Sequence, residues 1–252
     1  MSNFRSPLAD IPPVVKNLLI INVIFFIATH LFSSNGQYPL VQYLAVYYFD
    51  SPSFRIWQVV TYMFMHSPGS LMHILFNMFA LYSFGPVLEY TFGSKRFLNF
   101  YLLTGLGALA LQMLVQAIEV YGITGSITNP NTSTFDYATS MATLRIEGLS
   151  QEAGQKLLGL YYTPMLGASG AVFGILIGFG MLFPNAELIL IFLPIPIKAK
   201  YLIPFYIVVE LFLGVKQFEG DSVAHFAHLG GALFGFLLIK YWGIRRRPGG
   251  YL

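Results

Sequence analysis

The sequence contains no cysteine and few charged residues, and each shortage excludes a class of protein. Without cysteine the chain has no disulfide framework, no thiolate metal site and no cysteine nucleophile. Charged residues make up 10% of the 252 residues and apolar ones 56%, whereas soluble domains have roughly 25% charged residues. Because water alone cannot solvate such a chain, we predict an integral membrane protein.

Two signatures of hydrolytic chemistry are also missing. The sequence has no H-E-x-x-H motif and no pair of carboxylates suited to a catalytic dyad, which argues against a zinc protease and an aspartyl protease. The net charge of +3 comes from basic residues near the ends of apolar segments, a pattern of membrane topology and not of a nucleic-acid surface. We therefore expect no metal, no other cofactor and no nucleic-acid partner.

The apolar segments predict an all-α polytopic membrane protein with six transmembrane helices in one membrane domain, residues 14–242. A span needs roughly 20 apolar residues, and the fifth segment is shorter than that. The predicted spans are about 14–32, 71–90, 97–117, 167–183, 201–213 and 223–242. They leave an N-terminal tail at 1–13, external loops at 33–70 and 118–166, and a basic C-terminal tail at 243–252.

Three stretches between the spans have their own character. Residues 35–70 are rich in tyrosine, phenylalanine and tryptophan, which favour the membrane interface, so this first external loop is predicted to be membrane-associated. Residues 188–197 are apolar but too short to span, and they contain two prolines, so we place them at the interface as well. Within the second external loop, one short helix is expected around residues 150–158.

Basic residues indicate the orientation of the chain, because they concentrate on the cytoplasmic side of membrane proteins. With both termini inside, the cytoplasmic side collects Arg5, Lys16, Lys95, Arg96, Lys198, Lys200, Lys240 and Arg245 to Arg247, against Arg55, Arg145, Lys156 and Lys216 outside. The first span is expected to remain as a signal anchor. We predict a multi-pass protein of the bacterial cytoplasmic (inner) membrane with both termini in the cytoplasm.

A serine lies near the start of the fourth predicted span, within the sequence G-A-S-G at residues 167–170. Glycine then recurs every fourth residue, at Gly170, Gly174 and Gly178, the pattern that lets two membrane helices approach closely. We interpret Ser169 as a nucleophile that works inside the membrane. Serines in membrane helices also serve as interhelical hydrogen-bond donors, and this plainer role stays open for Ser169 on its own.

The predicted topology brings unusual polar residues to one depth, because the second, fourth and sixth spans all begin on the outer side. His73 and Asn77 are four residues apart and share one face of the second span. His228 lies within two turns of the start of the sixth span, with Gly231 and Gly235 on the same face. These glycines would let the sixth helix approach the fourth and bring the imidazole within hydrogen-bond reach of the serine.

Each of these residues also has a plainer interpretation. A histidine or an asparagine inside a membrane can simply tie helices together, and Gly231 and Gly235 can serve packing alone. His66 and His225 are expected near water as loop residues, and His30 is expected to be structural or incidental. A shared site is favoured because four polar side chains at one depth are hard to explain as separate helix contacts.

Three motifs in this order resemble the rhomboid family of intramembrane serine proteases, over about residues 57–235. The G-A-S-G sequence at 167–170 is similar to the family's G-x-S-G motif, and A-H-L-G-G at 227–231 to its A-H-x-x-G helix. H-I-L-F-N at 73–77 matches the H-x-x-x-N of its second helix. The resemblance implies that Ser169 is the nucleophile, that His228 is the base, and that His73, Asn77 and the backbone amide of Ser169 form the oxyanion hole. The supporting positions are Gly167, Gly170, Gly231 and Gly235.

By this resemblance the chain would hydrolyse peptide bonds in or near the transmembrane segments of other proteins in the bilayer, through an acyl-enzyme on a Ser-His dyad. One departure is Trp57-Gln58, where rhomboids often carry a Trp-Arg pair. Two alternatives remain. One is a catalytically inactive rhomboid-like protein that binds or traffics membrane proteins; the other is a transporter, for which Glu210 would be the one central acidic residue.

Overall fold

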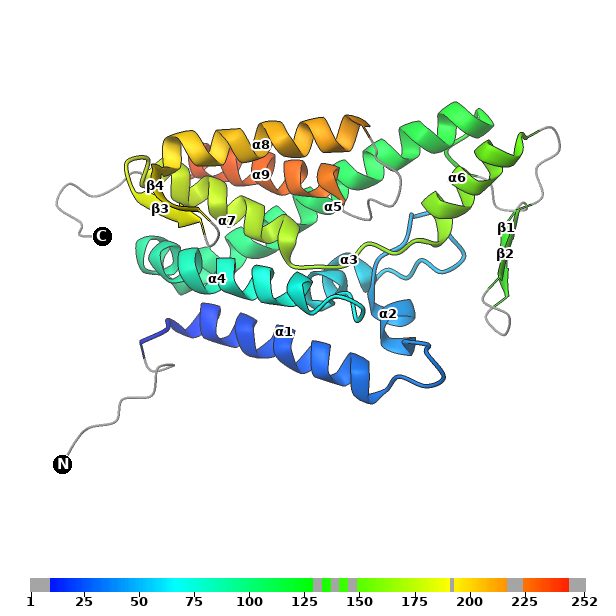
Figure 1. Cartoon of the computed structure of the whole chain (residues 1–252), viewed down its shortest axis with the longest axis horizontal. Helices are drawn as coiled ribbons and strands as arrows, with labels where there is room; N and C mark the ends of the chain where they lie inside the picture. The colour runs from blue at the N-terminus through cyan, green and yellow to red at the C-terminus, as the bar shows by residue number, and fades with distance from the viewer. Residues whose placement is uncertain are drawn as a thin grey trace.

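Six helices of 14 residues or more make up most of the chain that the structure describes. The computed structural model describes residues 10–128, 133–136, 141–144, 149–190, 193–216 and 224–244. The six helices are α1 (Pro13–Leu31), α4 (Leu71–Phe92), α5 (Ser94–Thr124), α7 (Ser169–Leu182), α8 (Ala199–Lys216) and α9 (His225–Tyr241). Figure 1 shows α4 lying between α1 on one side and α7, α8 and α9 on the other.

Three of these helices, α1, α4 and α5, are long and apolar enough to cross a membrane, judged by length and composition within the described residues. Helix α7 is apolar but has 14 residues. Large apolar side chains stay exposed along the outer faces of the helices, among them Ile24, Ile27, Phe205, Val208 and Phe236. Exposed apolar area on this scale is typical of a surface that faces lipid. The prediction of a mostly helical membrane protein is confirmed.

The centre of the bundle is formed by α5, α7 and α9, which approach one another at small residues. Gly231 of α9 lies directly against the backbone of Gly170 in α7, and Gly235 lies against the backbone of Gly174 one turn further along. A side chain at any of these positions would separate the helices. Close backbone contact of this kind is how membrane helices gain packing energy without a hydrophobic effect between them.

A buried glutamate caps the first helix from a distance. Helix α1 begins at Pro13 without a side-chain cap of its own. Instead, the carboxylate of Glu89 in α4 accepts hydrogen bonds from the backbone N–H groups of Val14 and Val15, at 3.0 and 2.8 Å. The hydroxyl of Ser94 donates to the same carboxylate. Negative charge at a helix N-terminus satisfies unpaired amides and the helix dipole, so Glu89 fixes α1 to α4.

The first connection, 33–70, contains three short helices: α2 (Pro39–Leu44), α3 (Gln58–Thr61) and the 3₁₀ helix η1 (Tyr62–Phe64). Gln58 organises it from a fully buried position. Its side-chain oxygen accepts from the backbone N–H of Arg55, and its amide nitrogen donates to the carbonyls of Tyr43 and Ser53. The glutamine at the position of the usual arginine therefore connects separate backbone segments of this loop by hydrogen bonds.

The second connection adds a helix and extends another. Helix α6 (Gln151–Tyr162) is capped by Ser150, in agreement with the short helix expected there. Helix α5 continues seven residues beyond the predicted end at 117 and stops at Gly125, whose φ of +74° is the usual left-handed helix cap. The predicted span ended at 117, two residues before the charged Glu119, but in the structure that side chain pairs with Lys156 of α6 at 3.2 Å.

Two short hairpins depart from the all-α prediction. Strands β1 (Ser133–Asp136) and β2 (Met141–Leu144) pair antiparallel in the second connection. Strands β3 (Glu187–Leu190) and β4 (Leu193–Lys198) pair between α7 and α8, where an apolar interfacial segment was expected. Two prolines close together disfavour a helix in this segment, and strand pairing satisfies its backbone groups instead.

Candidate active site

Ser169 is the first residue of α7, and the turn before it is built on a glycine. Gly167 has a φ of +133°, a conformation that residues with a side chain rarely adopt. Its N–H donates to the carbonyl of Tyr62 at 3.0 Å, which fixes the turn to η1. The backbone also pairs at Val46 and Met165, in both directions. The first connection therefore fixes the position of the segment that precedes Ser169 and α7.

The imidazole of His228 meets the hydroxyl of Ser169 across the α7–α9 interface. The Nε2 atom of His228 lies 2.8 Å from Oγ of Ser169. Phe173, one turn after the serine, stacks on the imidazole with the ring centroids 4.3 Å apart and the planes 8° from parallel. The distance is within the range of a nucleophile and its general base, and the stacking fixes the plane of the ring.

The other nitrogen of His228 contacts a carboxylate that sequence reasoning did not include in the site. Oε2 of Glu210, in α8, lies 2.9 Å from Nδ1 of His228 and 2.7 Å from Nδ1 of His225. A signal was present, since an acidic residue inside an apolar helix needs a partner. The expectation that His225 is a loop residue near water is wrong, because it begins α9 and is 7% exposed.

His73 lies against the turn before the serine. A side-chain atom built on Gly167 would sit 3.0 Å from Nε2 of His73 and 3.6 Å from Oγ of Ser169, so both polar atoms flank one point. The backbone N–H of Ser67 donates to Nδ1 of His73 at 3.2 Å. This bond leaves the proton of a neutral imidazole on Nε2, so His73 presents an N–H donor towards the serine turn.

Asn77 is 5% exposed and lies one turn below His73 on the same helix. Its side-chain amide donates to the backbone carbonyl of His73 at 2.8 Å. Among the hydrogen bonds of the described residues, none joins Asn77 to Ser169 or His228. The structure therefore brings Ser169, His228 and His73 together, while the amide of Asn77 is turned towards its own helix.

His66 is fully buried beside His73, with the ring centroids 5.2 Å apart. It lies in the segment between η1 and α4, and burial, together with the neighbouring His73, lowers its pKa to about 3. Desolvation disfavours the charged imidazolium, so His66 stays neutral at physiological pH. The expectation that it is a loop residue near water is wrong.

The helices that carry these side chains begin at one end of the bundle. Figure 1 shows the first turns of α4, α7 and α9 at the same end, while α8 runs in the opposite direction. Glu210 lies in the second half of α8. This opposite direction brings Glu210 to the level of the first turn of α9.

Glu210, His225 and His228 form the one group of possible metal ligands found among the described residues, with ligand atoms within 4.8 Å of one another. Sequence reasoning did not anticipate this group. Both Nδ1 atoms approach the same carboxylate oxygen at hydrogen-bond distance. Two Nδ1–H groups that donate to one carboxylate oxygen account for these distances without a metal ion, so we assign the group as a hydrogen-bonded cluster.

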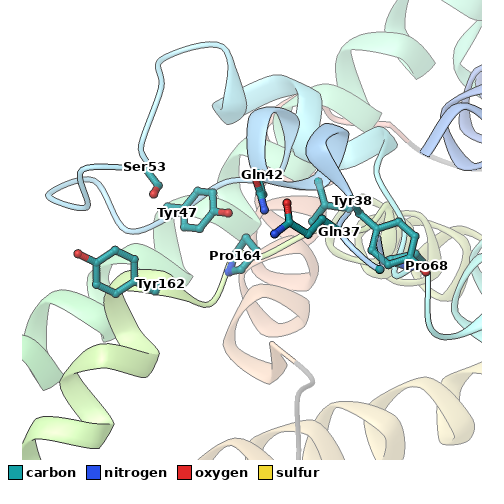
Figure 2. A pocket seen from close by; sticks show the side chains of 10 residues that line it. Gln37, Tyr38, Gln42, Tyr47, Ser53, Pro68, Tyr162 and Pro164 are labelled. Atoms are coloured by element: carbon teal, nitrogen blue, oxygen red, sulfur yellow. The ribbon is translucent and has the colours of Figure 1, made fainter. Parts of the chain in front are cut away.

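A cavity of about 330 Å³ lies beside the segment that leads to α7. Figure 2 shows its walls: the first connection supplies Gln37, Gln42 and Tyr47, and the opposite side is formed by Tyr162 and Pro164. The remaining lining residues are Gly36, Tyr38, Val41, Ser53 and Pro68. The wall carries both aromatic and amide side chains, and it contains none of the dyad residues.

Comparison with known proteins places these motifs in context. A sequence model of the Rhomboid domain matches residues 53–129 and 131–245. An uncharacterized mitochondrial rhomboid protein of Schizosaccharomyces pombe is 30% identical over 75% of this chain and 52% of its own length. The mitochondrial presenilin-associated rhomboid-like protein of Homo sapiens is 27% identical over 93% of this chain and 49% of its length. The rhomboid protease GlpG of Haemophilus influenzae is 25% identical over 71% of this chain and 94% of its length.

These relatives correct one prediction. The chain spans about half the length of the mitochondrial relatives that it matches. Their names place them in mitochondria, which contradicts the prediction of a bacterial cytoplasmic membrane and points to a mitochondrial membrane instead. Charge bias could not make this distinction, because it reports the orientation of helices and not the identity of the membrane.

Proposed function

The chain belongs to the rhomboid family, and from this we propose that it is an intramembrane serine protease that cleaves other membrane proteins in or near their transmembrane segments. The observation that carries the proposal is the 2.8 Å contact between Oγ of Ser169 and Nε2 of His228. A serine hydroxyl alone is a weak nucleophile, and an imidazole at this distance is the group that activates it.

The proposed reaction has two steps. As Oγ of Ser169 attacks the peptide carbonyl, its proton passes to Nε2 of His228, and the imidazolium then returns that proton to the leaving amine. The substrate acyl group stays on the serine as an ester. A water molecule gives a proton to Nε2 of His228 as it attacks the ester. The bond from the acyl carbon to Oγ of Ser169 then breaks, the imidazolium returns the proton to Oγ, and the carboxylic acid is released.

The tetrahedral intermediates carry a negative oxygen that needs donors. We assign this role to the backbone amide of Ser169, to Nε2–H of His73 and to the amide of Asn77. The first is an amide of a helix N-terminal turn, where N–H groups have no partner within the helix. The bond from Ser67 supports the second. The side-chain nitrogen of Asn77 has two N–H groups: one donates to the carbonyl of His73, and the other can donate to the substrate oxygen.

This assignment predicts a graded loss in the oxyanion variants. Asn77→Ala and His73→Ala should each lower kcat by about ten- to a thousandfold and leave a measurable rate, since two donors remain in each case. KM should change less than kcat, because the donors act on the charge of the transition state. Steady-state cleavage of a transmembrane peptide in liposomes measures both. A complete loss of cleavage in Asn77→Ala would contradict the oxyanion role. It would mean that Asn77 is needed for proton transfer by the dyad or for folding.

We propose that all six long helices cross the bilayer, with both ends of the chain on one side and the dyad near the other. The exposed apolar side chains of α8 and α9 and the apolar composition of α7 support this arrangement, as does the common starting end of α4, α7 and α9. A dyad in the first helical turns lies near the water that hydrolysis consumes. A substrate helix must unwind to expose its peptide bond, so glycine or proline near the cleavage site should favour cleavage.

Labelling with a fluorophosphonate tests the proposal, because this probe reacts with an activated serine. The purified full-length chain in detergent should be labelled, and Ser169→Ala should abolish the label. The label should survive EDTA, since the mechanism uses no metal. Absence of labelling in the native chain would favour an inactive rhomboid-like protein, and loss with EDTA that zinc restores would indicate a different enzyme class.

A further inference from the structure

Glu210 is a buried carboxylate in an apolar helix, and its hydrogen bonds join it to two histidines of α9, one of which is the base of the dyad. Its exposed fraction is 7%. One of its oxygens, Oε2, contacts Nδ1 of His228 and Nδ1 of His225. The two histidines are three residues apart in the first turn of α9, so they present their rings to the same side of the helix. A charged group is costly inside a membrane unless its partners are close and complete.

We propose that Glu210 is a positioning residue of the Ser169–His228 dyad. The site is then a chain of three hydrogen-bonded side chains, Glu210 of α8, His228 of α9 and Ser169 of α7. The inference rests on the proposed function. An ionised carboxylate can only accept hydrogen bonds, so it selects the imidazole tautomer with a proton on Nδ1. In that tautomer Nε2 of His228 is unprotonated and can accept the proton of the serine.

The same contact acts when charge develops. During the attack His228 becomes an imidazolium, and the carboxylate 2.9 Å from its Nδ1 stabilises that charge in surroundings that screen charge far less than water does. The stacked ring of Phe173 and the bond to Glu210 together leave the imidazole no freedom to rotate away from Ser169. A dyad without this support would spend part of its time in the wrong tautomer.

His225 anchors the carboxylate. Its Nδ1 lies closer to Oε2 than that of His228 does, at 2.7 Å, and its ring stands at 89° to the ring of His228. The β-carbon of His225 also lies 3.1 Å from the point where a side chain on Gly214 would begin. Helix α8 therefore approaches α9 closely near the cluster, and His225 holds Oε2 in place while His228 reacts.

Glu210→Gln tests the inference with little change in volume. In the full-length chain in liposomes, kcat should fall on the order of 10²- to 10⁴-fold, while KM should stay within about twofold because the substrate contacts are intact. The activity that remains should persist to lower pH than in the native chain, since a protonated His228 has lost its counter-charge. The titratable groups that face His228 are Glu210 of α8, His225 of its own helix and His73 of α4. The α5 residues that pack against Gly170 and Gly230 near the dyad, Gly107 and Ala108, are not titratable.

Glu89→Gln is the matched control, because Glu89 is also a buried carboxylate with several donors but caps α1. It should lower the melting temperature and leave the pH profile of kcat unchanged. Cleavage by the native chain that is lost in Ser169→Ala establishes the protease independently. Against that background, a Glu210→Gln variant with native kcat and native pH profile overturns the positioning role alone.

A second measurement needs no activity. In the full-length chain labelled with ¹⁵N-histidine, the ring signals of His228, identified by their loss in His228→Ala, should show a proton on Nδ1. Glu210→Gln should give a mixture of tautomers. A native chain with the proton on Nε2 of His228, or unchanged signals in Glu210→Gln, contradicts the inference even if cleavage fails for another reason.

Discussion

Ser169→Ala and His228→Ala should each abolish cleavage of a transmembrane substrate, and the double variant should be no slower than either single variant. The nucleophile and its base act as one unit, so removing either atom of the 2.8 Å pair removes the whole proton transfer. Losses in kcat on the order of 10⁵- to 10⁶-fold are typical of such units. Cleavage of a fluorogenic transmembrane peptide in liposomes over several days measures residual rates at this level.

The melting temperature is the control for these variants. Ser169→Ala removes one hydroxyl at a helix start and should leave the melting temperature nearly unchanged. His228→Ala removes the stacking partner of Phe173 and leaves Glu210 bonded to His225 alone, so a moderate decrease is expected. Full cleavage by Ser169→Ala would reduce the serine to a packing residue. Losses that multiply in the double variant would show two independent contributions.

The contact between Ser169 and His228 could be anticipated from sequence because membrane segments tolerate few polar residues. Each polar side chain in an apolar segment is a candidate for function, and the direction of each span fixes its depth. The glycines at 170, 174, 231 and 235 further indicated which helix pair approaches closely, and the structure brings these glycines together in pairs. Little else in the sequence was needed to connect α7 with α9.

An acidic residue in an apolar segment indicated that Glu210 has a buried partner, but the identity of that partner could not be anticipated, because it depends on the offset between α8 and α9. The predicted fifth span, 201–213, gave neither that offset nor the helix that runs from Ala199 to Lys216. The role of Gln58 was equally hidden, since its three partners are backbone groups of a loop. The β3–β4 hairpin was missed because its apolar composition resembles that of a helix and its alternation is interrupted by proline.

Gly231→Leu should lower both the activity and the melting temperature, more than any other single glycine substitution in the bundle. A side-chain atom at this position would overlap the carbonyl oxygen of Gly170, which is backbone and cannot turn away. The helices α7 and α9 must therefore separate, and Ser169 is the residue next to Gly170. Overpacking of this kind typically costs about 1–3 kcal/mol or more, and a shift of 1 Å between nucleophile and base lowers the rate by about 100-fold.

Gly122→Leu is the matched control, because Gly122 lies within α5 and nothing approaches the position of its missing side chain within 4 Å. A leucine there should leave cleavage unchanged and should keep or raise the melting temperature, since glycine disfavours a helix interior by about 1 kcal/mol. Gly231→Ala should fall between the native chain and Gly231→Leu, because one carbon already overlaps Gly170. If Gly231→Leu cleaves and melts like the native chain, α7 and α9 do not approach at Gly170, and the distance between Ser169 and His228 has to be set by other contacts.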